Sequence, residues 1–160
     1  MIREDKGMPF LLRYENVAWY EDGQVRILDR RVYPREVKFV NCKTYKEVVL
    51  AIQNLVTQSA GPYTAVGMGM ALAAYESRNL EKSERIKFLE EAEDALRNAR
   101  ITTASRYGII TSRCLEIAKE AIANGEDSIE LIVEDTVNSL NRRYTTMQKV
   151  GDSLLELIPE

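Results

Sequence analysis

The chain has 160 residues, of which 45% are hydrophobic and 29% charged, and its formal net charge is −3. This composition provides enough apolar surface for a core and excludes wholesale disorder. The mild acidity argues against a nucleic-acid binder that relies on bulk positive charge. Because the sequence contains no histidine, it lacks the commonest general base and metal ligand, and every Ser–His or Cys–His pair.

The segment 10–41 is predicted to form a small antiparallel β-meander. The Asp-Gly pair at 22–23 is among the strongest signals for a hairpin turn. Residues 17–20 and 24–29 flank this turn, and residues 36–40 repeat the same period of two. The sequence therefore predicts three consecutive strands.

The apolar period becomes helical after the strands. Thr44 and Glu47 have the spacing of a capping box, in which the two side chains satisfy exposed amides at the start of a helix. This helix is predicted to end near residues 59–61, and Pro62 suits the first turn of the next helix. The many Ala and Gly residues of that second helix indicate close approach to a packed helix or to a ligand.

Two further helices are predicted, over residues 83–98 and from Thr103 or Ser105 to Asn124. The acidic run at 90–94 is interpreted as a mostly solvated face. The inward positions of the later helix are expected to be Ile109, Ile110, Cys114, Ile117, Ala118, Ala121 and Ile122.

A last helix is predicted to begin at Asp127, to kink at Gly151 and to end at Pro159, with a length of about 45 Å. Alternating spacings of three and four residues give it a narrow, mainly apolar stripe. The stripe consists of Val133, Val137, Leu140, Tyr144, Met147, Gly151, Leu154 and Ile158. Such a stripe either closes the helical bundle or is available to a partner.

Together these elements predict one α+β domain over residues 1–160 that is mostly helical. Residues 1–43 form its small β-sheet portion, and residues 44–160 form a bundle of about five helices. The amino terminus does not resemble a signal peptide, and the most apolar stretch, 61–75, is shorter than the roughly 20 residues that cross a bilayer. We therefore expect a cytoplasmic protein that binds neither membrane nor nucleic acid.

Several catalytic motifs are absent from the sequence. It has no P-loop, HExxH or GxSxG motif, and residues 67–72 lack the third glycine of a dinucleotide-binding fingerprint. Cys42 and Cys114 are interpreted as reduced core thiols, since no histidine is present to activate them. We expect no metal, no cofactor and no catalytic residue in this chain.

Three blocks, at 17–44, 58–74 and 99–104, resemble the N-terminal region of methylthioribose-1-phosphate isomerase. Their most similar parts read VAWYEDGQV, QSAGPYTAVG and ARITTA. That enzyme family is related to the alpha, beta and delta regulatory subunits of translation initiation factor 2B. The resemblance implies that the family's catalytic cysteine and aspartate lie in a C-terminal Rossmann-like domain, which this sequence does not contain.

The resemblance also implies which residues bind a sugar phosphate. Arg100 is expected to hold the phosphate group through charge-assisted hydrogen bonds. Backbone amides and hydroxyls at two helix starts are expected to assist, at Gly61, Tyr63, Thr64, Thr102, Thr103 and Ser105. The alternative is that Arg100 pairs with a carboxylate of the acidic run and that the Ala- and Gly-rich segment only packs tightly.

The sequence departs from the family at three relevant positions. Ser59 stands where the isomerases have a substrate-contacting arginine, so one expected charge contact is missing. Ile101 replaces a proline, and Ser105 stands where an asparagine is usual.

The sequence is compatible with three different functions. The first is the substrate-binding-side domain of an S-methyl-5-thioribose-1-phosphate isomerase-like protein, an aldose–ketose isomerase whose catalytic half comes from another chain. The alternative is a non-catalytic binding or assembly module related to the factor 2B regulatory subunits. A helical adaptor of unrelated function is a third. The expected partners are a sugar phosphate, further copies of the chain, or a separately encoded subunit with the C-terminal domain.

Overall fold

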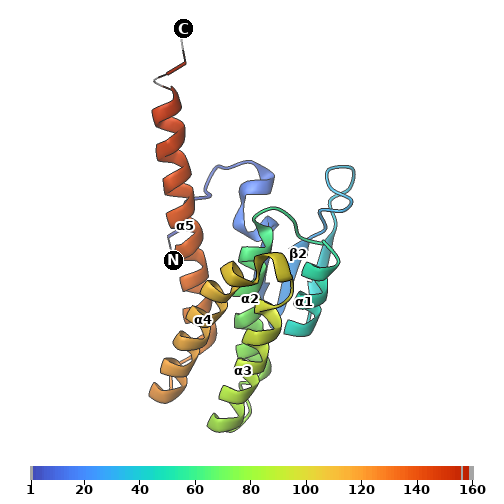
Figure 1. Cartoon of the computed structure of the whole chain (residues 1–160), viewed down its shortest axis with the longest axis vertical. Helices are drawn as coiled ribbons and strands as arrows, with labels where there is room; N and C mark the ends of the chain where they lie inside the picture. Colours follow the sequence, from blue (N-terminus) through green and yellow to red (C-terminus); the bar gives the residue numbers. More distant parts are fainter. Residues whose placement is uncertain (1, 156, 159–160) are drawn as a thin grey trace.

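The computed structural model describes residues 2–155, 157 and 158. It confirms an α+β architecture that is mostly helical, with a three-stranded sheet followed by five α-helices (Figure 1). The elements are β1 (Ala18–Glu21), β2 (Gln24–Leu28), β3 (Phe39–Cys42), α1 (Tyr45–Gln53), α2 (Gly61–Glu76), α3 (Lys82–Arg97), α4 (Ala104–Asn124) and α5 (Ser128–Leu155). None of the helices in the described residues is long and apolar enough to span a membrane.

The sheet is antiparallel in the order β1-β2-β3, as predicted. Asp22 and Gly23 form the predicted turn with φ of 49° and 75°. A β-carbon at Gly23 would lie 2.5 Å from the Tyr75 ring, so this turn also requires glycine for space.

Two details of the predicted sheet were wrong. Residues 10–12 and 14–16 form 3-10 turns instead of strands, because their backbone N–H groups bond to carbonyls three residues back. The third strand begins at Phe39 instead of residue 36. Glu36 N–H donates to the Val32 carbonyl at 3.2 Å, so the turn after β2 extends over the expected start of this strand.

Helix α1 begins as predicted but ends earlier. Thr44 Oγ1 accepts a hydrogen bond from Glu47 N–H at 3.3 Å, while the Glu47 carboxylate accepts from Lys43 N–H at 2.5 Å, one residue before the cap. The helix ends at Gln53 because Leu55 adopts a φ of 57° and Val56 N–H bonds back to the Ala51 carbonyl. This is a Schellman ending, which normally uses glycine at the Leu55 position.

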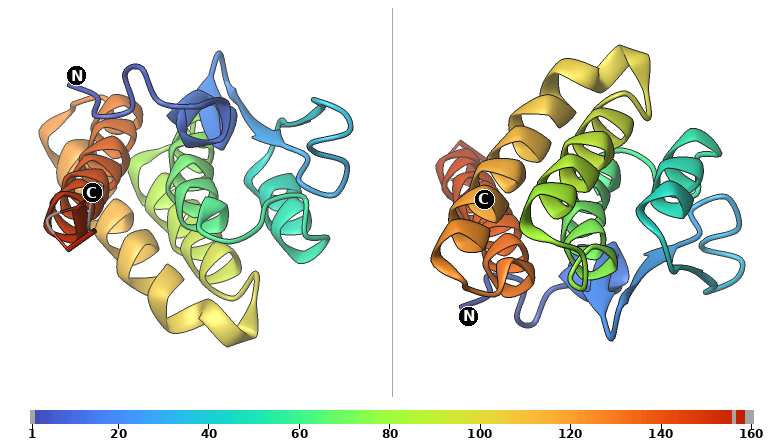
Figure 2. Two further views of the ribbon diagram at one scale, coloured as in Figure 1. Left: turned by 90° about the horizontal axis from the view of Figure 1, so that it is seen from above. Right: turned by 90° about the horizontal axis from the view of Figure 1, so that it is seen from below.

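Helix α2 is the centre of the molecule. It contacts β1, β2 and each of the other four helices, and the sheet and α5 lie on opposite sides of it (Figure 2). Its small residues allow close helix packing, as a β-carbon at Gly67 would lie 2.5 Å from Thr136 Oγ1 of α5, and one at Gly69 would lie 3.0 Å from Leu96 of α3. The sequence analysis explained these small residues by close approach either to a packed helix or to a ligand. Packing against helices accounts for both glycines.

Helices α3 and α4 have nearly the predicted bounds, but two of their side chains were assigned to the wrong surface. Glu93 is only 8% exposed, because its Oε1 atom accepts hydrogen bonds from Arg97, Thr111 and Ser112. Ile109 was expected inside and is 74% exposed. It lies two positions, or about 200° around the helix, from the buried Tyr107.

Helix α5 begins where Asp127 accepts a hydrogen bond from Ile129 N–H at 2.8 Å. It continues as helix through Gly151 to Leu155, a length of about 42 Å at 1.5 Å per residue. Its first half packs against α2 and α4, and its second half extends away from the rest of the molecule (Figure 1). The predicted end at Pro159 lies outside the described residues.

Candidate functional site

The two predicted groups of site residues lie at one end of the bundle. Helices α2 and α4 begin at this end, and α5 continues beyond it (Figure 1). The rings of Tyr63 and Tyr107 join the two helix starts edge to face, with centroids 5.6 Å apart. We call this region, which comprises residues 57–64, 97–107 and 140–147, the open end.

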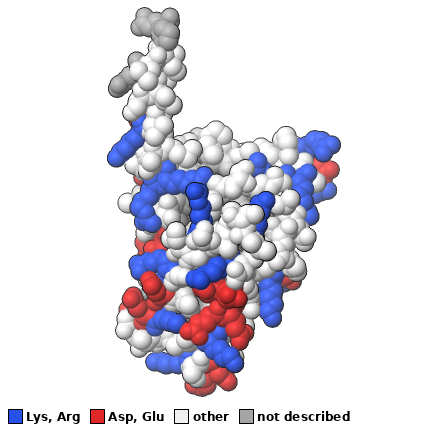
Figure 3. Space-filling view, viewed as in Figure 1, with Lys and Arg blue, Asp and Glu red and all other residues white. Residues whose placement is uncertain are grey.

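Charge is distributed unevenly along the bundle. On the face in Figure 3, acidic side chains gather on the lower half, whereas Lys and Arg predominate around the base of the extended part of α5. The open end therefore combines two helix starts, whose dipoles favour anions, with exposed cationic side chains.

Arg100 lies in the turn between α3 and α4 and has an exposed side chain. Its carbonyl accepts hydrogen bonds from Thr103 N–H at 3.0 Å and from Thr103 Oγ1 at 3.3 Å, which order the turn. Among the described residues, the guanidinium has no ion-pair partner, so the structure does not show the alternative pairing with a carboxylate of α3. Thr102 and Ser105 are also exposed beside it, and no side chain caps the start of α4.

The start of α2 has fewer free amides than the sequence suggested. Gly61 N–H donates to the Gln58 carbonyl at 3.0 Å, Tyr63 N–H donates to the Ala60 carbonyl at 3.2 Å, and Pro62 has no N–H. Gly61 itself is a packing requirement, since a β-carbon there would collide with Thr57 Oγ1. These engaged amides weaken the expected role of the α2 start as an anion site.

Two cavities lie beside the start of α2. The first, of about 240 Å³, is enclosed by residues 11–17, residues 57–61 and α5, and the second, of about 520 Å³, lies between α4 and α5. Thr64, Leu140 and Arg143 line both cavities. Neither cavity is lined by Arg100, Thr102, Thr103 or Ser105. The predicted site residues thus share one end of the bundle but do not surround one cavity.

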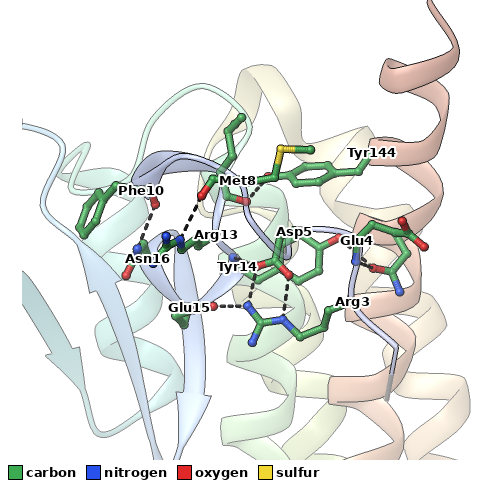
Figure 4. Close-up of polar contacts among 12 residues, drawn as sticks. Arg3, Glu4, Asp5, Met8, Phe10, Arg13, Tyr14, Glu15, Asn16 and Tyr144 are labelled. Carbon is green, nitrogen blue, oxygen red and sulfur yellow. Dashed lines mark hydrogen bonds and ion pairs between the residues drawn. The ribbon is translucent and has the colours of Figure 1, made fainter. Parts of the chain in front are cut away.

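A polar network at the open end was missed by the sequence analysis (Figure 4). Asn141 of α5 accepts hydrogen bonds from Tyr14 Oη at 2.8 Å and Glu4 N–H at 3.1 Å, and its amide donates to the Ile2 carbonyl at 2.8 Å. Tyr144 Oη donates to the Leu12 carbonyl at 2.7 Å. These bonds hold residues 2–14 against α5, and no local sequence signal marks contacts between positions so far apart.

Asp5 is the buried charge of this network. It accepts hydrogen bonds from Arg3 and from Tyr14 N–H, the latter at 2.7 Å. Burial raises the pKa of the Asp5 carboxyl, but the bonds and charge of Arg3 and the Tyr14 N–H more than offset it, so that this pKa lies below its ordinary value. Arg3 also pairs with Glu15, and the cluster fixes residues 3–15 as a folded segment.

The two cysteines have the environment of core residues. Cys42 is 1% exposed and Cys114 is fully buried. Burial raises the pKa of the Cys42 thiol to about 11 and that of Cys114 to about 12, which disfavours the reactive thiolate. In the described part of the chain, no group of three Cys, Asp or Glu residues is placed to hold a metal ion.

Comparison with known proteins agrees with the resemblance in the sequence. No family model matches the chain. Methylthioribose-1-phosphate isomerase from Trichodesmium erythraeum is 26% identical over 153 residues, which are 95% of this chain and 43% of that protein. The enzyme from Nostoc punctiforme is 28% identical over 145 residues, or 89% of this chain and 40% of that protein. The chain thus spans about two fifths of the length of the curated relatives it matches.

Solved structures extend the comparison to the fold. The 5-methylthioribose 1-phosphate isomerase from Pyrococcus horikoshii matches 78% of this chain and 35% of its own, with a TM-score of 0.67 and 28% identity. Subunit delta of translation initiation factor eIF-2B from A. fulgidus matches 82% of this chain and 37% of its own, with a TM-score of 0.60. At 23% identity, the second match shows a shared fold alone. The chain is therefore similar to the N-terminal domain of these isomerases.

Proposed function

We propose that this chain, a relative of methylthioribose-1-phosphate isomerases, is the substrate-side domain of an isomerase-like protein that acts on a sugar phosphate. The observation that carries the proposal is the exposed guanidinium of Arg100 at the open end, which has no ion-pair partner among the described residues. The resemblance places a substrate-contacting arginine at this position. Its position in an ordered turn beside exposed Thr102 and Ser105 supports a role in holding a phosphate group.

In this proposal the domain binds the substrate and does not supply the catalytic acid and base. An aldose–ketose isomerisation moves a proton between C1 and C2 and requires an acid and a base beside these atoms. Residues 2–158 offer no histidine, and their two cysteines are buried with raised pKa values. In this proposal the reacting groups lie outside this sequence, since the resemblance places the family's catalytic cysteine and aspartate in a further domain.

The test is a calorimetric titration of the chain with 5-methylthioribose 1-phosphate. Arg100→Ala should weaken binding by about 1.5–3 kcal/mol, the range for hydrogen bonds to charged groups. Arg106→Ala is the matched control, because Arg106 is an exposed arginine of the first turn of α4 that lines neither cavity. If both variants bound 5-methylthioribose 1-phosphate with equal affinity, Arg100 would not hold its phosphate group.

A second function, as a non-catalytic assembly module, is supported by the second half of α5. Met147, Val150 and Leu154 are each more than half exposed there. In this version Leu154→Glu should dissociate the complex that the protein forms, whereas Lys149→Glu, at an exposed position of the same helical segment, should not. Sedimentation velocity provides the readout, and an unchanged profile for Leu154→Glu with the fold intact would rule this version out.

A further inference from the structure

Strand β3 lies at an edge of the sheet and pairs on one side. The sheet has the order β1-β2-β3, so β2 is the strand beside it in the described part of the chain. Asp29 N–H, directly after β2, donates to the Lys38 carbonyl at 2.9 Å. Because hydrogen-bonded and non-hydrogen-bonded pairs alternate in an antiparallel ladder, this bond and the strand register direct the backbone groups of Val40 and Cys42 toward β2. The backbone groups of the other two residues of β3 therefore point away from the sheet.

These two residues, Phe39 and Asn41, form a free strand edge. Among the described residues, no group outside the sheet forms a hydrogen bond with the backbone of either. Such an edge is a template for another extended chain, and native proteins commonly shorten it, cover it or charge it. Strand β3 has four residues, and Lys38 and Lys43 flank it. Both flanking charges are positive, so they oppose pairing of β3 with a second copy of itself and favour an acidic chain.

A groove of about 530 Å³ lies beside this edge, between β3 and α1. Val40 of β3 and Leu50 and Ala51 of α1 form an apolar part of its wall. Leu50 is 54% exposed, although it lies well inside α1. Because successive side chains of a strand point to opposite faces, every second side chain of a chain added to β3 would face this wall.

The surroundings of the groove are basic. Residues 29–47 contain six Lys and Arg and three Asp and Glu, whereas the whole chain has a net charge of −3. On the face in Figure 3, Lys and Arg predominate at the upper right, where Figure 1 shows the loop after β2. Arg31 and Lys43 both line the groove with exposed side chains. Arg31 pairs with Asp29, and the Glu47 carboxylate in the groove accepts a hydrogen bond from Lys43 N–H, but the Lys43 ammonium has no ion-pair partner among the described residues.

The opposite edge of the sheet differs in charge. Residues 14–23, which include β1, contain Glu15, Glu21 and Asp22 and no Lys or Arg. Glu15 and Glu21 are paired with arginines, so this edge has no excess of positive charge. An acidic chain is therefore directed to β3 and not to β1.

We propose that β3 and the groove beside α1 form a docking site for an acidic, extended segment of a partner protein, which adds to the sheet as a fourth strand. Backbone hydrogen bonds to Phe39 and Asn41 supply affinity in this mode of recognition. Apolar side chains at every second position of the segment contact Leu50, and its carboxylates face Lys43. The docking site contains none of the residues assigned to the sugar phosphate, so it does not depend on the proposed function.

Titration of the chain with a fluorescein-labelled EVEVEV peptide, followed by fluorescence polarisation at fixed ionic strength, tests the site. This peptide should bind more tightly than labelled KVKVKV and more tightly than an oligothymidylate of eight nucleotides. Absence of EVEVEV binding, or equal binding of KVKVKV, would overturn the acidic docking site. Tighter binding of the oligonucleotide would overturn it in favour of nucleic acid.

Amide hydrogen exchange provides a readout that is specific to strand addition. With EVEVEV bound, the N–H groups of Phe39 and Asn41 should exchange more slowly, because the added strand accepts hydrogen bonds from them. The N–H groups of Val40 and Cys42 are the internal control, since they already point toward β2 and should change little. Unchanged exchange at Phe39 and Asn41 with saturating peptide would overturn the strand pairing.

Two variants of α1 locate the peptide in the groove. Leu50→Glu should weaken EVEVEV binding about tenfold or more, because an apolar contact is lost and a like charge is introduced. Gln53→Glu is the matched control, since it adds the same charge at an exposed position of α1 that does not line the groove, and it should cause a smaller loss. Both positions are exposed, so we expect both variants to fold, which circular dichroism checks. Equal losses in the two variants would overturn the groove in favour of general charge repulsion.

Discussion

Both halves of helix α5 carry apolar side chains, but these side chains have different surroundings (Figure 1). In the first half, Ile132 and Val137 are completely buried. In the second half, Met147, Val150 and Leu154 are between 55% and 56% exposed. The spacing of apolar residues therefore defines a face of the helix, and burial of that face depends on whether another element reaches it.

Other elements reach only the first half because of contacts that are specific to it. Helix α2 approaches α5 closely at Gly67, where the absent side chain makes room for Thr136. The N-terminal segment then covers α5 as far as Asn141 and Tyr144. In the described part of the chain no element packs beyond this point, so the two halves should respond differently to the same kind of substitution.

The largest effect is expected from truncation of the buried half. Ile132→Ala should lower the free energy of unfolding by about 2–5 kcal/mol, since it removes buried methyl groups and leaves a cavity. Leu154→Ala in the exposed half should change it by no more than about 0.5 kcal/mol. Urea unfolding at low protein concentration measures both. Equal losses would mean that the second half is packed in the folded chain.

A methyl group added where α2 approaches the first half of α5 should have a different effect from one added in the second half. Gly67→Ala places a methyl group 2.5 Å from Thr136 Oγ1 and should cost about 1–3 kcal/mol of stability. Gly151→Ala is the control, because nothing lies within 4 Å of the new methyl group, and it should stabilise the helix by about 0.5–1 kcal/mol. Chemical denaturation of both variants checks the opposite signs, and a neutral Gly67→Ala would contradict the close approach of α2 and α5.

The boundary between the halves is predicted to depend on Asn141. Asn141→Ala removes three hydrogen bonds to the N-terminal segment and should destabilise the fold by about 1–2 kcal/mol. Amide hydrogen exchange of residues 2–14 should also accelerate, because their attachment to α5 is lost. Asn138→Ala, an exposed position of the same helix, should change neither quantity.

Much of the fold was predictable because it depends on local signals. The turn at Gly23, the cap at Thr44 and the proline at the start of α2 each act within a few residues, and each was found in its predicted place. The end of α1 was missed because Leu55 occupies the left-handed position that usually requires glycine. A strained residue of this kind is held by surrounding structure, which the local sequence does not reveal.

The candidate site was harder to predict than the fold. Glu93 was assigned to a solvated face, since its spacing matches its acidic neighbours, but Thr111 and Ser112 of α4 make its burial favourable. The contacts of Asn141 and Tyr144 with the N-terminal segment were missed because they join residues that lie far apart in the sequence. The role of Arg100 came from the resemblance, and it remains a prediction.

The smallest expected effect concerns the charge of Asp5, which fixes the segment that covers the first half of α5. Its pKa is lowered in the folded chain, so its contribution to stability is present above the ordinary value near 3.9 and is lost as the pH falls through the folded value. Asp5→Asn should lower stability at pH 7 by about 1 kcal/mol, because the amide oxygen still accepts the Tyr14 N–H while the pairing with Arg3 is weakened. The difference from the parent chain should shrink below pH 4 in urea unfolding measured from pH 7 to 3. Asp152→Asn, at an exposed position of the second half, is the control, and its unfolding free energy should follow that of the parent chain at each pH. If the difference between Asp5→Asn and the parent chain were constant across the pH range, Asp5 would act through its shape and not its charge.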